Sequence, residues 1–184
     1  RLSLVGSEMC IRDRYVTNCN TMKYSAKEPC YLETFYNVLE IKDADTKVVK
    51  HAFSKEEKEI RLYGIDAPEI RKNRKLKIDE EKTHLPASLL IELGWEARNY
   101  LTNVLSIWDW ITILTEIKNA YDFYHRQLGY VILESGECLN ELLLQNGYAK
   151  ASRDYYCSKL AEYQLMNRTA QLNKIVIYAR ISHF

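Results

Sequence analysis

The chain has 184 residues, of which 47% are hydrophobic, with only 6 glycines and 3 prolines. This composition fits one globular domain with a substantial core and argues against a disordered protein. The formal net charge is +1, from 26 basic and 25 acidic residues, which excludes the strong overall field of a bulk nucleic-acid binder. No run of 18 apolar residues occurs, so we expect no transmembrane helix and no membrane partner.

The start of the chain is unusual. Residues 1–14 (RLSLVGSEMCIRDR) begin without methionine and resemble translated sequencing-adapter read-through, so we expect a non-native tail. An ordinary N-terminal strand is the alternative, because Leu2 and Leu4 alternate. We interpret residues 15–33 as an N-terminal extension and residues 34–184 as the folded domain, which we expect to be monomeric. The compartment, secreted or cytoplasmic, stays open because the true start is in question.

Strands come first in the expected order of elements. Alternating and β-branched residues predict strands over residues 34–41, 46–53 and 59–65, followed by a long charged connection over residues 70–88. A helix follows this connection, because apolar residues recur there at helical spacing: Leu89, Leu93, Ala97, Tyr100, Leu101 and Val104.

Two further strands and two further helices complete the domain. β-Branched and aromatic residues predict strands over residues 108–117 and 126–133, the second followed by an ESGE turn. A short leucine-rich helix is expected to end at Gly147, a typical C-terminal cap. The last helix is expected over residues 158–173, with the apolar residues 175–178 packing its exit onto the body of the domain.

The charged connection and the cysteines leave alternatives open. A basic run in residues 70–88 would be able to follow a nucleic-acid backbone, but such runs are more often solvated surface, and acidic residues follow at once. Cys10 lies in the suspect tail, and the other cysteines are widely spaced without a CxxC pair, which argues against a zinc site. Buried free thiols are the favoured interpretation, with two disulfides as the alternative.

The segment IRLYGIDAPE, residues 60–69, carries the most information about chemistry. Arg61 lies within a buried strand, where a guanidinium is expensive to bury unless an anion meets it. Pro68 cannot donate to a β ladder, so Asp66 and Glu69 are expected on the turn that leaves the sheet. An arginine and two carboxylates at one turn suggest phosphodiester chemistry, against the alternative of a surface strand with a charged turn.

A second acidic turn lies between the first two expected strands. Short polar residues at 43–46 (DADT) turn the backbone and can direct oxygens inward. Two nearby carboxylates repel unless a cation or a proton lies between them, so Asp45 and Asp66 are candidates for a hard-cation site. A second arginine, Arg126, closes the segment DFYHR at residues 122–126.

Five segments in this order resemble the staphylococcal-nuclease-like (thermonuclease) family. They are KDADT at 42–46, RLYGIDAPE at 61–69, GWEA at 94–97, DFYHRQLGYV at 122–131 and NELLLQNGYAK at 140–150. The resemblance implies an α+β, mainly β fold: an OB-fold, a five-stranded Greek-key barrel with three helices. It also implies a Ca²⁺-dependent phosphodiesterase that acts on DNA and RNA and leaves 3′-phosphate ends.

The resemblance implies roles position by position. Asp45 and Asp66 match metal carboxylates, and Ala67 matches a position that offers its backbone carbonyl to the metal. Glu69 matches the general base that activates water. Phosphate binding is implied for Arg61 and Arg126, and substrate contacts, with an aromatic face for base stacking, for Tyr124 and Tyr155.

Several departures from the family pattern accompany these matches. Ala44 and His125 stand where the family usually has glycine, so we expect a different backbone in the loop before Arg126. Phe123 replaces a lysine of the best-known member, and the segment 66–94 is longer than the compact family pattern. None of these removes a predicted metal or catalytic group. The intact set favours an enzyme over the alternative, a non-catalytic OB-fold module that binds nucleic acid or protein.

Overall fold

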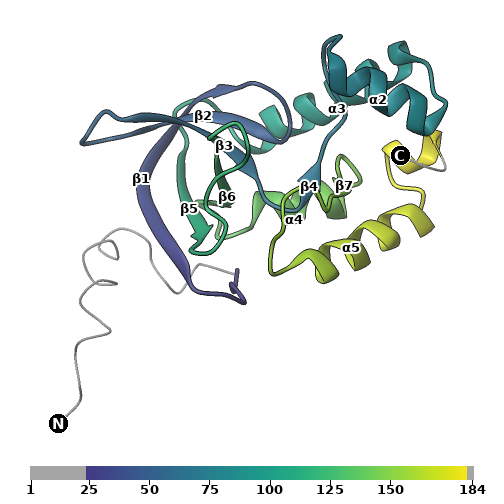
Figure 1. The fold of residues 1–184 in the computed structure, drawn as a ribbon. Helices are drawn as coiled ribbons and strands as arrows, with labels where there is room; N and C mark the ends of the chain where they lie inside the picture. Colours follow the sequence, from purple (N-terminus) through teal and green to yellow (C-terminus); the bar gives the residue numbers. More distant parts are fainter. Residues whose placement is uncertain (1–23, 182–184) are drawn as a thin grey trace.

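Five strands close into a barrel in the computed structural model, which describes residues 24–181 (Figure 1). The barrel order is β1-β2-β3-β6-β5. Neighbours pair antiparallel except β3 and β6, which are parallel, and β1 closes the barrel by pairing with both β2 and β5. The prediction of a five-stranded OB-type barrel is therefore confirmed. The strands are β1 (Cys30–Ile41), β2 (Thr46–His51), β3 (Glu57–Leu62), β5 (Trp110–Glu116) and β6 (Gln127–Leu133).

The described chain begins after the segment expected to be a non-native tail. Residues 1–14 and Cys19 lie outside the described residues, so that expectation stays a prediction. β1 begins at Cys30, earlier than the expected residue 34, because residues 30–33 pair with β5. The cysteines that the structure describes are free thiols, as the favoured interpretation predicted: Cys30, Cys138 and Cys157.

Apolar side chains from every strand fill the barrel. β-Branched and leucine side chains alternate into the interior, and burying them provides most of the driving force for folding, at about 25 cal/mol per Å² of apolar surface. Members of this core that are fully buried include Val38, Val49, Ile60, Leu62, Ile113 and Leu128.

The three expected helices are present, with α3 (Ala87–Val104), α4 (Leu139–Gln145) and α5 (Leu160–Leu172) close to their predicted bounds. Two short helices were not predicted: α2 (Arg74–Thr83) and α6 (Ile177–Arg180). The long connection expected at 70–88 therefore contains a helix, α2, in addition to the three expected helices. Among the described residues, none of the helices is long and apolar enough to cross a membrane.

α2 escaped prediction because it is almost entirely polar. Only Leu76 and Asp79 are buried, so the helix presents no apolar stripe to a periodicity argument. Its start is nevertheless well specified, because the Asn73 side chain accepts a hydrogen bond of 2.8 Å from the Leu76 N–H. The charged run thus contains a capped helix, α2, on the surface of the domain.

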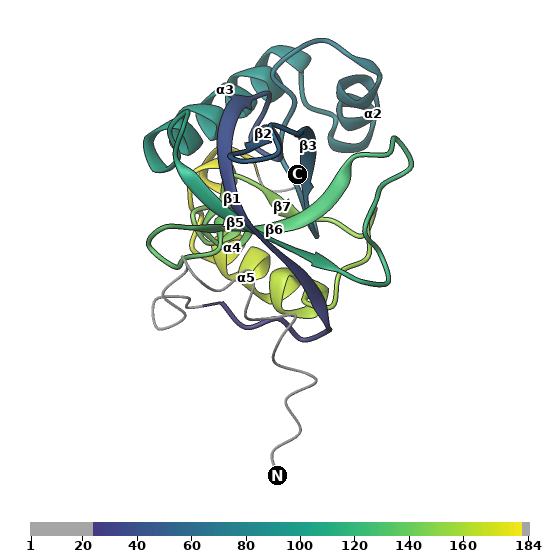
Figure 2. The ribbon, with the colours of Figure 1, turned by 90° about the vertical axis from the view of Figure 1, so that its left-hand side faces the viewer.

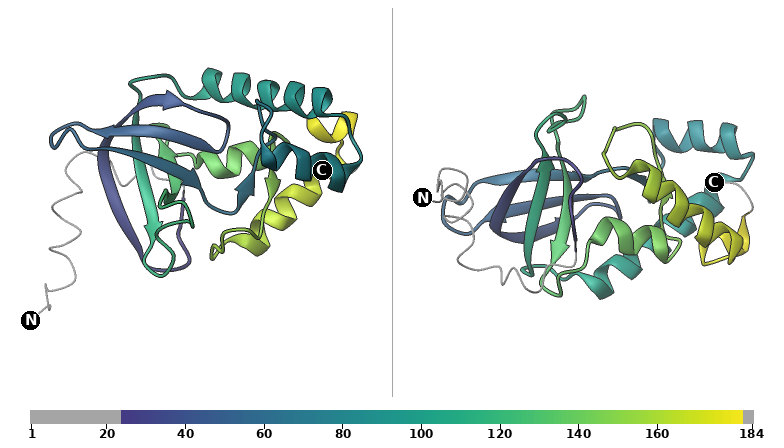
Figure 3. Two further views of the ribbon diagram at one scale, coloured as in Figure 1. Left: turned by 45° about the horizontal axis from the view of Figure 1, so that its top comes forward. Right: turned by 90° about the horizontal axis from the view of Figure 1, so that it is seen from below.

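The expected third strand is divided into β3 and the two-residue β4 (Ile65–Asp66), which pairs with β7 (Lys150–Ala151). Gly64 separates them with a φ of 64°, a left-handed conformation that glycine adopts at little cost. The small β4-β7 sheet lies between the barrel and the helices (Figure 1). α2, α5 and α6 gather beyond it while α3 runs back along the barrel, as two further views show (Figure 3).

The C-terminal residues pack as expected. Ile177 and Tyr178 are buried, and Ile177 joins Leu93 of α3 in a small second apolar cluster. Seen from the barrel side, α2 and α3 lie above and α4 and α5 below (Figure 2). The acidic turn before β2, β4 and the start of α2 meet at this junction of barrel and helices.

Candidate active site

A buried guanidinium joins the two predicted metal carboxylates. Arg61 is in β3, where it pairs with Thr46 of β2, and this register sets Asp45 beside it. Arg61 Nη1 lies 2.7 Å from Asp45 Oδ2, and Nη2 lies 3.2 Å from Asp66 Oδ1 in β4. All three side chains are 5–7% exposed. The anion that a buried arginine requires is therefore supplied by the protein's own carboxylates.

Asp45 is held ionised by its surroundings. Its Oδ2 accepts a hydrogen bond from the Ala67 N–H at 3.0 Å, and its Oδ1 accepts one from the Thr46 hydroxyl at 3.0 Å. Burial alone would raise the pKa of Asp45, but the charges of Arg61 and Lys75 lower that pKa below its ordinary value. The neighbouring Asp43 behaves oppositely, because burial and the Asp45 charge raise its pKa to about 7.

Lys75, in the first turn of α2, contacts Asp66 and Glu69 and was not predicted as a site residue. Its Nζ lies 2.6 Å from Asp66 Oδ1 and 2.8 Å from Glu69 Oε1, and it donates to the Ala67 carbonyl at 3.2 Å. Burial alone would lower the pKa of Lys75, but the charges of Asp45 and Asp66 raise it above its ordinary value. Lys75 was missed because nothing in its charged segment indicated that a helix would turn it inward.

Glu69 is positioned from two sides. Its Oε2 accepts a hydrogen bond of 2.7 Å from the Asn73 side chain, the residue that also caps α2. On the other side α3 approaches closely, because a Cβ at Gly94 would lie 2.6 Å from the Glu69 carbonyl oxygen and 2.8 Å from that of Pro68. Gly94 belongs to the GWEA motif, and this close contact explains why the motif has a glycine at this position.

The second arginine is anchored by Asp122. Arg126 Nε donates to Asp122 Oδ2 at 2.7 Å, while Asp122 Oδ1 accepts from the backbone N–H of Tyr124 at 2.9 Å and of Arg126 at 2.8 Å. Arg126 Nη1 donates at 3.4 Å to the Thr46 hydroxyl, which itself bonds Asp45. The Arg126 side chain is 24% exposed, so its guanidinium is accessible to a ligand.

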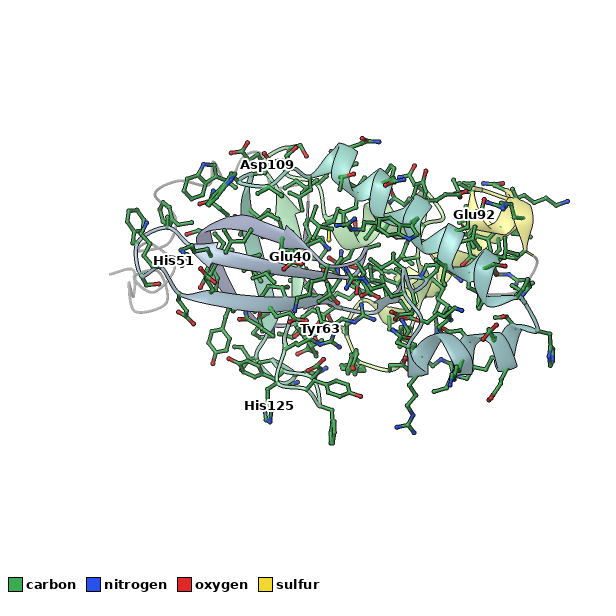
Figure 4. The ribbon with its side chains drawn as sticks, turned by 90° about the horizontal axis from the view of Figure 1, so that it is seen from above. Glu40, His51, Tyr63, Glu92, Asp109 and His125 are labelled. Atoms are coloured by element: carbon green, nitrogen blue, oxygen red, sulfur yellow. The ribbon has the colours of Figure 1, made fainter. Side chains whose placement is uncertain are left out.

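His125 occupies a strained position before Arg126. Its φ of 60° is the left-handed conformation that glycine favours, which costs a non-glycine residue roughly 1–2 kcal/mol. Its side chain lies at the tip of the loop and points away from the body of the molecule (Figure 4). The position thus keeps a glycine-like backbone even though a histidine occupies it.

Two tyrosines complete the predicted set. The Tyr124 side chain is exposed, and its ring centroid lies 5.6 Å from the Arg126 guanidinium carbon. The Tyr155 ring centroid lies 5.9 Å from the guanidinium carbon of Arg61. With the contacts above, a continuous chain of interactions joins every predicted site residue at one end of the barrel.

Two further residues of the cluster were missed by the sequence analysis. Lys150 of β7 lies opposite Asp66 in the β4-β7 ladder, and its Nζ is 3.5 Å from Asp66 Oδ2 and 3.9 Å from Asp79 Oδ1. Lys150 ends the NELLLQNGYAK segment, which was the one available signal for it. Asp79 had no signal, because it belongs to the unpredicted helix α2.

The donor chemistry of this cluster fits a hard cation. Carboxylate oxygens of Asp45 and Asp66 and the Ala67 carbonyl are the ligand types that Ca²⁺ prefers. The Lys75 ammonium meets two of these three groups, so these oxygens already bind a cation in this structure. Within residues 24–181, however, no group of three or more His, Cys, Asp or Glu side chains is arranged to hold a metal ion.

Comparison with known proteins adds two findings. A family model described as "Staphylococcal nuclease homologue" matches residues 59–180. Over 90 residues the chain is 40% identical to endonuclease YhcR of Bacillus subtilis (strain 168), and this region is 49% of the chain and 7% of that protein. The chain therefore corresponds to a small part of this relative's length. Asp45 lies before the matched segment, whereas the other predicted site residues lie within it.

Proposed function

This chain belongs to the staphylococcal nuclease homologue family, and we propose that it is a Ca²⁺-dependent nuclease that hydrolyses phosphodiester bonds of DNA and RNA. The observation that carries the proposal is the buried cluster in which Arg61 contacts both Asp45 and Asp66, with Glu69 joined to it through Lys75. Two carboxylates, a candidate base and guanidinium groups together at one end of the barrel fit phosphoryl chemistry better than a structural role.

Asp45, Asp66 and the Ala67 carbonyl are the groups that would hold calcium. Bound there, the ion would neutralise charge on the scissile phosphate and help to orient a water molecule. The lowered pKa of Asp45 supports this role, because the carboxylate is ionised at neutral pH and requires no proton loss to bind a cation.

Glu69 and the two arginines are assigned to the chemical step. Glu69 takes a proton from the attacking water, whose oxygen forms a bond to phosphorus. The bond from phosphorus to the 5′ oxygen breaks, the 5′ oxygen takes a proton from bulk water and leaves as a hydroxyl, and the phosphate stays on the 3′ oxygen. Arg61 and Arg126 stabilise the extra negative charge of the pentacoordinate transition state with planar, multidentate hydrogen bonds. Asn73 supports Glu69 by fixing one of its oxygens at 2.7 Å.

The exposed aromatic side chains beside Arg126 suit a single-stranded substrate. Phe123 and Tyr124 are 88% and 72% exposed, and their rings meet edge to face. Each presents a face on which an unpaired base can stack, worth about 1–3 kcal/mol per base. We assign Tyr124 and Tyr155 to substrate binding, in a protein that acts as a monomer.

A non-catalytic binding module is the second candidate. The specific observation in its favour is that Arg61 and Lys75 already engage the predicted metal carboxylates. In this alternative the positive groups and exposed aromatics bind a nucleic-acid strand without cleaving it.

One assay separates the two candidates. A 5′-labelled single-stranded DNA, and the matching RNA, are incubated with the protein in Ca²⁺ or in excess EGTA, and binding is measured in parallel. The nuclease proposal expects cleavage in Ca²⁺ with phosphatase-sensitive 3′ ends and none in EGTA. Full activity in EGTA would contradict calcium dependence, and binding without cleavage in any divalent metal would favour the module.

A further inference from the structure

Lys75 contacts oxygens to which calcium is assigned above. Its ammonium lies 2.6 Å from Asp66 Oδ1 and 3.2 Å from the Ala67 carbonyl oxygen, and also 2.8 Å from Glu69 Oε1. These contacts come from β4 and the turn after it, whereas Lys75 comes from α2. One flexible cation from a separate element thus contacts two of the three groups that are assigned to a divalent ion, Asp66 and the Ala67 carbonyl.

An ammonium and a calcium ion exclude each other at this position. Ca²⁺ binds its oxygens at about 2.3–2.6 Å, so it would need close contacts with Asp66 Oδ1 and the Ala67 oxygen, both of which Lys75 Nζ already contacts. Their like charges repel strongly at such distances in a partly buried site. Arg61 and Lys150 already place further positive charge beside Asp66.

We propose that Lys75 is a built-in competitor of calcium, whose ammonium must leave the cluster before the metal binds. This inference rests on the proposed function, and it adds that a side chain of the protein regulates calcium binding. Lys75 sets the calcium concentration at which the site fills, because every calcium ion that binds must displace three contacts of the ammonium.

The position of Lys75 allows this displacement. The side chain is 34% exposed and lies in the first turn of α2, a helix held by the buried Leu76 and Asp79 rather than by Lys75 itself. A lysine has four rotatable side-chain bonds, so the ammonium can swing into water without unwinding the helix.

Displacement of Lys75 also changes Glu69. When the ammonium leaves, Glu69 Oε1 loses its ion pair, while Oε2 keeps the hydrogen bond from Asn73. The carboxylate is then positioned but no longer neutralised, which is the state that a general base requires. Calcium binding and release of the base become one event.

Calcium affinity tests the proposal directly. Isothermal titration calorimetry without nucleic acid compares the wild type with Lys75→Met, and with Lys77→Met as the matched control, because Lys77 is an exposed lysine on the same helix. Removal of a unit charge that contacts the ligand oxygens is expected to tighten calcium binding at least about tenfold, whereas the control changes it by about twofold or less.

Chemical labelling of the wild type gives a second test that needs no variant. Acetylation of lysines followed by mass spectrometry measures the reactivity of Lys75 relative to Lys77 in EGTA and in saturating Ca²⁺. The proposal expects this ratio to rise several-fold with calcium, because the ammonium moves into water. An unchanged ratio overturns it, even if Lys75→Met fails to fold.

The outcomes separate this inference from the proposed function. If the wild type binds calcium and Lys75→Met binds it no more tightly than the control does, only the competitor proposal is wrong. If the wild type and both variants bind no calcium at millimolar concentration, the competitor proposal and the calcium dependence of the proposed function are both wrong.

Discussion

Arg61 and Asp45 form an ion pair of 2.7 Å inside the protein, with both side chains almost completely buried. The β2-β3 register creates the pair, since Thr46 lies opposite Arg61 and the Leu62 N–H donates to the Asp45 carbonyl at 2.9 Å. Desolvation makes such a pair a weak source of net stability, but removing one partner leaves the other as an uncompensated buried charge. The pair is therefore expected to influence both stability and catalysis.

The first prediction concerns stability and its pH dependence. Arg61→Met should lower the free energy of unfolding at pH 7 by about 3–5 kcal/mol, because Asp45 and Asp66 lose the guanidinium between them. The pKa of Asp45 is lowered from 3.8 in the folded state, so its contribution to stability is present above pH 3.8 and is lost as pH falls below it. The deficit of the variant should consequently shrink below about pH 4.

Urea unfolding of both proteins at pH 7, 5 and 3.5 measures this effect. Arg168→Met, which removes an exposed arginine of α5, serves as the control and should change stability by less than about 0.5 kcal/mol at each pH. A deficit that is equal at all three pH values would show that lost packing, and not charge, accounts for the effect.

The second prediction concerns Gly94. A methyl group there would lie 2.6 Å from the Glu69 carbonyl oxygen, so Gly94→Ala must push α3 and the turn at Pro68 apart. Stability should fall by about 1–3 kcal/mol, and nuclease activity by at least about tenfold because Glu69 moves. Asn99→Ala on the exposed side of α3 should affect neither. Activity of Gly94→Ala at the wild-type level would show that the close contact does not position Glu69.

The third prediction concerns the cysteines. Burial raises the pKa of the Cys138 thiol to about 12. It also raises the pKa of the Cys157 thiol and that of the Cys30 thiol to about 11 each. Because the thiolate is the reactive form, these groups should react slowly with Ellman's reagent at pH 8 in the native state and quickly in urea. A variant with Cys10→Ser and Cys19→Ser removes the cysteines outside the described residues. If this variant shows fewer than three reactive thiols when it is unfolded in urea without a reducing agent, it contains a disulfide.

The fourth prediction concerns the start of the chain. We propose that residues 1–14 are not native to the domain, so their deletion should leave both the melting temperature and nuclease activity unchanged. Differential scanning fluorimetry compares the full and shortened chains. A fall of several degrees would mean that Leu2, Leu4 or Val5 packs onto the domain, and the interpretation as an adapter-like tail would be wrong.

Sequence patterns predicted the strands because apolar residues alternate along them, as in β1, and because Pro68 ends the third expected strand, whereas the barrel was implied by the resemblance to the nuclease family. They missed α2 because only Leu76 and Asp79 face inward, and therefore missed Lys75 and Asn73. The division of the third strand at Gly64 was also missed, since a single left-handed glycine leaves the apolar pattern intact. Side chains from segments far apart, such as Lys75 and Asp66, meet only through tertiary packing, which one sequence does not encode in any local pattern.

Glu69 and Arg126 are expected to take part in the chemical step and not only to bind the strand. Single-turnover cleavage of single-stranded DNA in saturating Ca²⁺, with affinity measured in parallel, tests this most directly on Glu69→Gln and Arg126→Lys. Glutamine keeps the shape of Glu69 but cannot take a proton, and lysine keeps the charge of Arg126 but loses the planar fork. Cleavage rates of both variants should be lower by at least about a hundredfold, while affinity for the strand changes by less than about tenfold. Near wild-type rates in both folded variants would contradict this expectation.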